Sequence, residues 1–166
     1  MGAVLVLTVS CSSPAREYAV PGELCGVGVP ASVLEPVLPP GKEISAHPTD
    51  PEGTGIARCR LHVDGKSVFS AGVEWWEKDT SARDVAGPAQ SVGPGDARSE
   101  DGRFVHSAAG AVGRVDCRAA DDAGRSVWAT VRTTRDGTTE EQMKDLVTAY
   151  ADAVGASGAC DEVLGR

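Results

Sequence analysis

The sequence lacks the short motifs that mark the commonest enzyme and metal sites. It contains no His-Glu-x-x-His pair, no Gly-x-Ser-x-Gly nucleophile turn, no Walker-type nucleotide loop and no calcium-binding loop. No two cysteines have Cys-x-x-Cys spacing, and His47, His62 and His106 lie far apart in the chain. We therefore expect neither an enzyme nor a bound metal or other cofactor.

Clusters of positive charge are missing as well. The formal net charge is −8, and the arginines are scattered among acidic residues. Binding to nucleic acid requires Lys and Arg gathered on one surface, so we exclude nucleic acid as a partner. The apolar share of 41% and the length of 166 residues predict a single globular domain.

The start of the chain has an apolar segment that is too short to span a bilayer. Residues 2–9 (GAVLVLTV) are typical of the hydrophobic region of a signal peptide, and residues 7–13 (LTVSCSS) resemble a bacterial lipobox. Such a box is cut before a cysteine that carries lipid, which here is Cys11. Plain secretion and a buried N-terminal strand are the alternatives.

This interpretation divides the chain into three parts. Residues 1–11 form a signal peptide ending at Cys11, residues 12–22 form a polar tether, and residues 23–166 form one extracytoplasmic domain. No basic residue precedes Arg16, although signal peptides begin with positive charge. We therefore expect the true start codon to lie upstream of Met1.

Four further cysteines are enough for two disulfides. We favour the pairs Cys25–Cys59 and Cys117–Cys160, because each would connect a helix end to its own hairpin. The alternative is Cys25–Cys160 together with Cys59–Cys117. Either arrangement predicts an oxidising compartment outside the cytosol.

One pattern occurs twice in the domain. Residues 59–69 and residues 117–128 both begin with Cys-Arg and pass an Asp close to a Gly. Both then continue with a basic residue, Ser, Val and an aromatic residue. Asp64-Gly65 is a favoured hairpin turn, and we expect residues 121–124 to form the matching turn.

The repeated pattern predicts two β-meanders, in half-repeats 23–78 and 103–160, joined by a long mobile loop at residues 79–102. The first copy has one residue more than the second, so we expect a β-bulge near Gly72. Residues 108–113 are small and predict a turn. The strands we expect are 43–46, 56–63 and 67–76 in the first copy and 104–107, 114–120 and 125–134 in the second.

Two helices complete the predicted fold. A short one has Pro30 at its first position, and a long amphipathic one begins at Thr138 or Thr139 and ends at Gly155. Its apolar face has the helical spacing i, i+3, i+4 and i+7 and consists of Met143, Leu146, Val147, Tyr150, Ala151 and Val154. The fold class is therefore α+β, with both helices packed on an antiparallel sheet of about six strands.

The residues that differ between the two copies are the candidate binding residues. Trp75 and Trp76 are adjacent in a predicted strand and point to opposite faces, so one belongs in the core and the other is partly exposed. An exposed Trp76 could anchor a ligand or partner, unless the 79–102 loop covers it. His62, on the surface or rim of the same hairpin, is the third candidate.

The lipobox-like start, the tether, Leu24-Cys25-Gly26 before a short helix and the later Cys59-Arg60 resemble small lipoproteins and secreted proteins of actinobacteria. The resemblance implies an extracytoplasmic, disulfide-bearing α+β domain and supplies no catalytic residues. We expect a membrane-anchored lipoprotein that binds a ligand or an envelope protein. The alternatives are an enzyme or enzyme inhibitor with its site near residues 79–102 and Trp75-Trp76, and an accessory subunit of a transporter or sensor.

Overall fold

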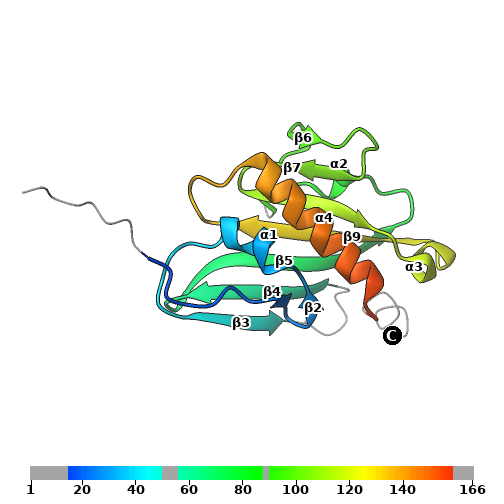
Figure 1. The fold of residues 1–166 in the computed structure, drawn as a ribbon. Helices are drawn as coiled ribbons and strands as arrows, with labels where there is room; N and C mark the ends of the chain where they lie inside the picture. The colour runs from blue at the N-terminus through cyan, green and yellow to red at the C-terminus, as the bar shows by residue number, and fades with distance from the viewer. Residues whose placement is uncertain (1–14, 50–55, 88–89, 159–166) are drawn as a thin grey trace, which may run out of the picture.

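A computed structural model describes residues 15–49, 56–87 and 90–158, so the predicted signal peptide and Cys11 lie outside the described residues. Its centre is an antiparallel sheet with the strand order β3-β4-β5-β9-β8-β7-β6 (Figure 1). The strands are β3 (Ile44–Thr49), β4 (Ile56–Val63), β5 (Lys66–Glu77), β6 (Ala97–Arg98), β7 (Phe104–His106), β8 (Gly110–Val115) and β9 (Arg125–Thr133). A small second sheet pairs β1 (Glu23–Leu24) with β2 (Val27–Gly28).

The α+β class is confirmed, with seven strands in the main sheet where we predicted about six. The helical segments are α1 (Ala31–Leu34), the 3-10 turn η1 (Glu35–Val37), α2 (Ala82–Val85), α3 (Arg118–Asp122) and α4 (Glu140–Ala156). None of the described helices is long and apolar enough to cross a bilayer.

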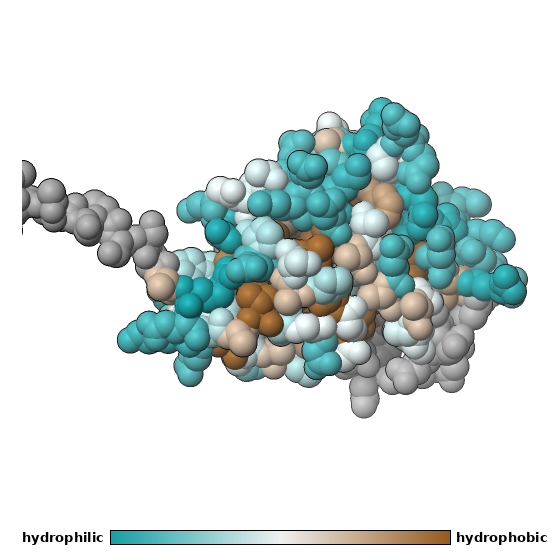
Figure 2. Space-filling view, in the orientation of Figure 1, coloured by the Kyte–Doolittle hydropathy of each residue, from teal (hydrophilic) through white to brown (hydrophobic). Residues whose placement is uncertain are grey.

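Helix α4 lies across one face of the sheet, as the amphipathic pattern predicted (Figure 1). Thr139 caps it: its hydroxyl accepts from the Gln142 amide at 3.2 Å, and the Gln142 side chain accepts from the Thr139 amide at 2.9 Å. All six predicted apolar residues are buried in the main core. Figure 2 shows this face, with hydrophobic residues between α1 and α4 and hydrophilic residues around them.

Gly155 does not end α4, because the helix continues to Ala156 and is capped by Ser157. Glycine is required at this position for a different reason, because a Cβ there would lie 2.9 Å from the backbone oxygen of Asp116. The absence of a side chain therefore lets the helix end approach the segment that follows β8.

The two predicted meanders are present and meet where β5 pairs with β9. The second copy departs from the first at its turn, where the short helix α3 replaces the expected hairpin turn at 121–124. Asp121 accepts from the Arg114 guanidinium at 2.9 Å, which holds α3 against β8. The strand expected at 114–120 therefore ends at Val115.

Residues 110–113, predicted as part of a turn, belong to strand β8. Small residues are required here by close packing and not by a bend. A Cβ on Gly110 would lie 1.7 Å from the Gln90 backbone oxygen, and one on Gly113 would lie 2.5 Å from the Phe104 ring.

The bulge predicted near Gly72 is wrong in position, because the ladder from Ser70 to Val73 is regular on both sides. The irregularity lies between Leu61 and His62, opposite Val68. Val68 and Phe69 are consecutive and both buried in the main core. A bulge turns two neighbouring side chains toward one face. Here it lets both Val68 and Phe69 point into the main core.

Residues 79–102 are not a featureless loop. They contain α2 and β6 and contribute Ala82, Val85, Ala86 and Val92 to a second apolar cluster. This cluster packs Trp128 on the sheet face opposite α4. Its side chains anchor the segment, which corrects the expectation of a long mobile connection.

Part of the expected tether also packs on the domain. The Arg16 guanidinium donates to the backbone oxygens of Glu35 at 2.8 Å and Leu38 at 2.7 Å. Tyr18 is buried. The folded domain therefore includes residues before Glu23, since these side chains satisfy carbonyls at the end of the helical segment.

The disulfide Cys25–Cys59 is confirmed, which excludes the alternative pairing of these two cysteines. It indicates a setting outside the reducing cytosol. Cys117 is buried and forms no disulfide with a described residue, and its predicted partner Cys160 lies outside the described residues. Cys117–Cys160 stays a prediction.

We predict that Cys117 and Cys160 are joined in the oxidised protein. Cys117 follows Asp116, which approaches Gly155 at the end of α4, so the chain leading to Cys160 starts close to Cys117. Non-reducing peptide mapping after thiol blocking should recover one peptide pair containing both residues. Alkylation of Cys117 in unfolded, unreduced protein would contradict the pairing.

A second prediction concerns Gly110→Ala. The added methyl group would collide with the Gln90 backbone, so the free energy of unfolding should fall by at least about 2 kcal/mol. Gly22→Ala is the matched control, because a Cβ there meets nothing within 4 Å. Urea unfolding of both variants measures the difference; equal stabilities would show that the packing argument is wrong.

Candidate functional site

The sheet face opposite α4 is only partly covered. The second apolar cluster covers the end near Trp128, whereas the outer faces of β3, β4, β5 and β9 carry polar side chains. Strand register places Arg132, Ser70, Arg60 and His47 in one row across these four strands. Because alternate side chains share a face, this row lies on the uncovered face.

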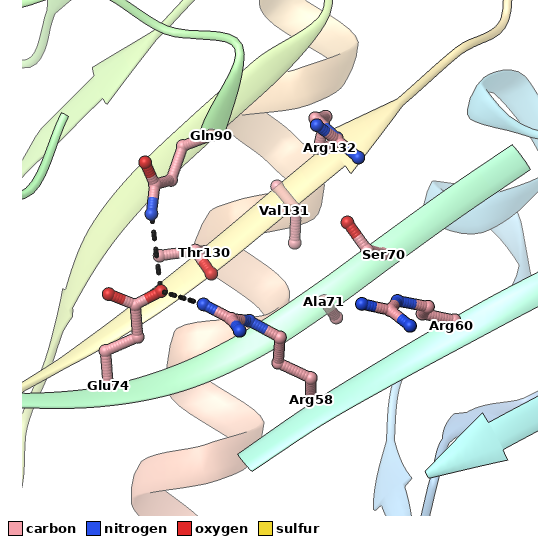
Figure 3. A pocket seen from close by; sticks show the side chains of 9 residues that line it. All are labelled: Arg58, Arg60, Ser70, Ala71, Glu74, Gln90, Thr130, Val131 and Arg132. Carbon is pink, nitrogen blue, oxygen red and sulfur yellow. Dashed lines mark hydrogen bonds and ion pairs between the residues drawn. The ribbon is translucent and has the colours of Figure 1, made fainter. Parts of the chain in front are cut away.

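A surface hollow of about 230 Å³ lies beside this row (Figure 3). A smaller hollow of about 150 Å³ adjoins it. Both are lined by Arg60, Ser70 and Arg132. These three residues, which we call the arginine pair with its serine, are therefore the centre of the candidate site.

Glu74 forms one end of the larger hollow. Glu74 is 5% exposed as a residue, and its carboxylate lies 3.7 Å from the Arg58 guanidinium and 3.3 Å from the Gln90 amide nitrogen (Figure 3). A buried carboxylate needs such partners. Glu74 thus compensates the charge of Arg58 and leaves Arg58 less available to a ligand.

Arg60 and Arg132 are both exposed and stand on either side of Ser70 in the register. Within the described parts of the chain, no ion pair or hydrogen bond involves the Arg60 side chain. Two guanidinium groups beside a hydroxyl place several N–H and O–H donors side by side along the two hollows. Such a set suits an oxyanion.

His47 and His62 lie together at the edge of the same face. Their ring centroids are 4.3 Å apart, and Ser45 Oγ is 2.9 Å from His47 Nε2. His47 is the register partner of Arg60, so this histidine pair adjoins the arginine pair. The two histidines are far apart in the sequence, so their contact could not be predicted from it. The contact arises because β3 pairs with β4.

The predicted tryptophans do not join this site. Trp75 packs on the main core and Trp76 on the second apolar cluster, so they face opposite sides. Both are partly buried, and residues of the 79–102 segment contact the cluster against which Trp76 packs. Of the predicted residues Trp75, Trp76 and His62, only His62 lies near the arginine pair with its serine, through its contact with His47.

The described residues contain no group of three or more His, Cys, Asp or Glu side chains that could hold a metal ion. Arg60 and Arg132 were not among the predicted site residues. Each arginine occupies an outward-facing position in an alternating strand pattern. Ordinary solvent-exposed residues occupy the same positions, so the pattern did not single out these two. The pairing of β4 with β5 and of β5 with β9 places them on either side of Ser70.

His106 stands apart from the site. It is buried in β7, and its Nδ1 has no hydrogen-bond partner among the described residues. Burial lowers the pKa of His106, while the charges of Glu140 and Asp96 oppose that shift. The imidazole is therefore neutral in the folded domain at neutral pH.

Comparison with known proteins yields no family model that matches the chain, and no match among curated proteins or solved structures. We therefore infer the function from the chemistry of the site itself.

We predict that His106 makes the domain sensitive to acid. Folding lowers the pKa of His106 below its unfolded value of 6.5. At a pH above 6.5 the imidazole is neutral in both states, so the domain keeps its full free energy of unfolding. As the pH falls below that value, the unfolded chain binds a proton that the folded chain excludes. The free energy of unfolding then declines by at most about 1.4 kcal/mol per pH unit.

The measurement is urea unfolding of the wild type and His106→Leu between pH 8 and about pH 5, a range set by the ordinary imidazole pKa. The wild type should lose more stability than the variant as the pH falls. Parallel curves for the two proteins would rule out this role for His106.

Proposed function

We propose that this protein is an anion-binding module of the cell envelope. The observation that carries the proposal is that Arg60 and Arg132 are the register partners of Ser70 on either side, and that all three residues line both adjoining hollows. Each guanidinium offers a planar fork of N–H donors that matches phosphate or carboxylate oxygens. The serine hydroxyl adds a donor between them.

The local charge contrasts with that of the whole chain. The protein carries a formal net charge of −8, yet the row across β9, β5, β4 and β3 contains two arginines and a histidine without an acidic residue. A long polyanion would be repelled by the surrounding negative potential. The contrast therefore supports a small anionic ligand and argues against nucleic acid.

Binding suits the site better than catalysis does. Catalysis by Ser70 would require a general base within hydrogen-bond reach, and the residues lining the two hollows include no histidine. The carboxylate of Glu74 lies beside Arg58 and Gln90. An enzyme or inhibitor site centred on Trp75-Trp76 has less support, since both side chains pack against apolar clusters.

The cellular setting belongs to the same proposal. The Cys25–Cys59 disulfide supports an oxidising compartment, and the lipobox-like sequence at Cys11 supports attachment to a membrane by lipid. In this setting the module would bind its ligand outside the cytosol. A role as accessory subunit of a transporter or sensor would use the same binding face.

The prediction is that Arg60→Ala and Arg132→Ala each weaken the binding of inorganic phosphate by about tenfold or more, the effect of losing one charge-assisted hydrogen bond. Isothermal titration calorimetry at low ionic strength measures the dissociation constants. Arg83→Ala is the control, because Arg83 is exposed on α2 and does not line either hollow.

Glu74→Gln tests the sign of the electrostatic effect. Removing this carboxylate releases Arg58 and should tighten phosphate binding, with thermal melting used to verify the fold. The proposal fails if the wild type does not bind phosphate, or if Arg83→Ala weakens binding as much as Arg60→Ala does.

A further inference from the structure

We infer that the site has a second anion subsite at His47, His62 and Ser45, and that its ligand is a small compound with two phosphate groups. The inference rests on the proposed function, because the first phosphate would occupy the arginine pair with its serine. It adds a neighbouring position that neither the motifs nor the comparisons assign.

The strand register sets the spacing of the two positions. The first is centred over Ser70 on β5, between Arg132 and Arg60, and the second lies between Arg60 on β4 and His47 on β3. Their centres are thus one and a half strands apart, or about 7 Å at the usual spacing of about 4.8 Å. At that separation the two positions would bind two distinct anionic groups, and one small ligand carrying both groups could span them.

The donors of the second position are already gathered. The two imidazole rings are 4.3 Å apart, and the Ser45 hydroxyl is 2.9 Å from His47 Nε2. Each imidazole supplies an N–H donor when neutral and two when protonated. Arg60 is the register partner of His47 and contributes a fixed positive charge to both positions.

Phosphate fits this donor set better than carboxylate does. One arginine fork can satisfy both oxygens of a carboxylate. Here the row offers several donors in succession: the Arg132 guanidinium, the Ser70 hydroxyl, the Arg60 guanidinium and the histidine pair. A phosphate group has more acceptor oxygens, directed tetrahedrally, and so can use donors that approach from several strands.

The charges around the histidine pair favour an anion over a metal cation. Arg60 is the register partner of His47, and the acidic residues next to these strand ends are Glu43, just before β3, and Asp64, just after β4. Asp64 Oδ1 already accepts from the backbone amides of Lys42 and Glu43 at 2.9 and 3.0 Å. The Arg60 guanidinium would repel a divalent cation, whereas a phosphate would gain from it.

The test compares orthophosphate with tripolyphosphate, whose two terminal phosphates can reach both positions. Calorimetric titration uses the full chain, the double variant His47→Ala/His62→Ala, the milder His47→Gln/His62→Gln and the Arg83→Ala control. We expect the alanine pair to weaken tripolyphosphate binding by about tenfold and to leave orthophosphate binding unchanged. Citrate, a compact polycarboxylate, should bind more weakly than tripolyphosphate.

Each outcome has a defined meaning. Unchanged tripolyphosphate affinity in both double variants would overturn the second subsite while leaving the proposed function intact. Equal losses for orthophosphate and tripolyphosphate would also overturn it, because the histidines would then act on the first position. If citrate binds as tightly as tripolyphosphate, the assignment to phosphate is wrong. Loss of orthophosphate binding on Arg60→Ala separately tests the proposed function.

Discussion

The antiparallel pairing of β5 with β9 is the constraint on which the rest of the structure depends. Nine residue pairs, from Phe69 opposite Thr133 to Glu77 opposite Arg125, join the two meanders into one sheet. The pairing aligns the apolar faces of both halves so that α4 can cover them together. It also brings Arg132 from the second half next to Ser70 and Arg60 of the first.

The two faces of this sheet have different fates. One is closed by α4, α1 and the Cys25–Cys59 disulfide, which fastens the N-terminal segment to β4. Among the described residues, the other face is covered at one end, by residues of the 79–102 segment over Trp128. The polar part that stays uncovered is where a ligand can reach the sheet, so the incomplete covering defines the candidate site.

Local patterns in the sequence predicted the elements whose formation depends on neighbouring residues. The capping box at Thr139, the apolar spacing of α4 and the Asp64-Gly65 turn all have local physical causes. The confirmed disulfide followed from the symmetry of the two copies. Elements that depend on distant packing were predicted less well, as Gly110 and Gly155 show. Each glycine is required because a backbone segment far away in the sequence packs closely against it.

The candidate site belongs to this second kind. His62 was singled out as a difference between the copies, but its contact with His47 requires the β3–β4 register, and the approach of Arg60 to Arg132 requires the whole sheet. In the linear sequence these arginines stand among acids. Scattered charge in a chain can therefore become a positively charged row on one face of a fold.

The most direct test of the central claim is an NMR titration that follows the arginine side-chain N–H resonances as phosphate is added. We expect the resonances of Arg60 and Arg132 to shift together and to saturate at one common dissociation constant, while that of Arg83 stays unchanged. Uniform, non-saturating shifts of all arginines would contradict the claim, because they would show only general screening of charge.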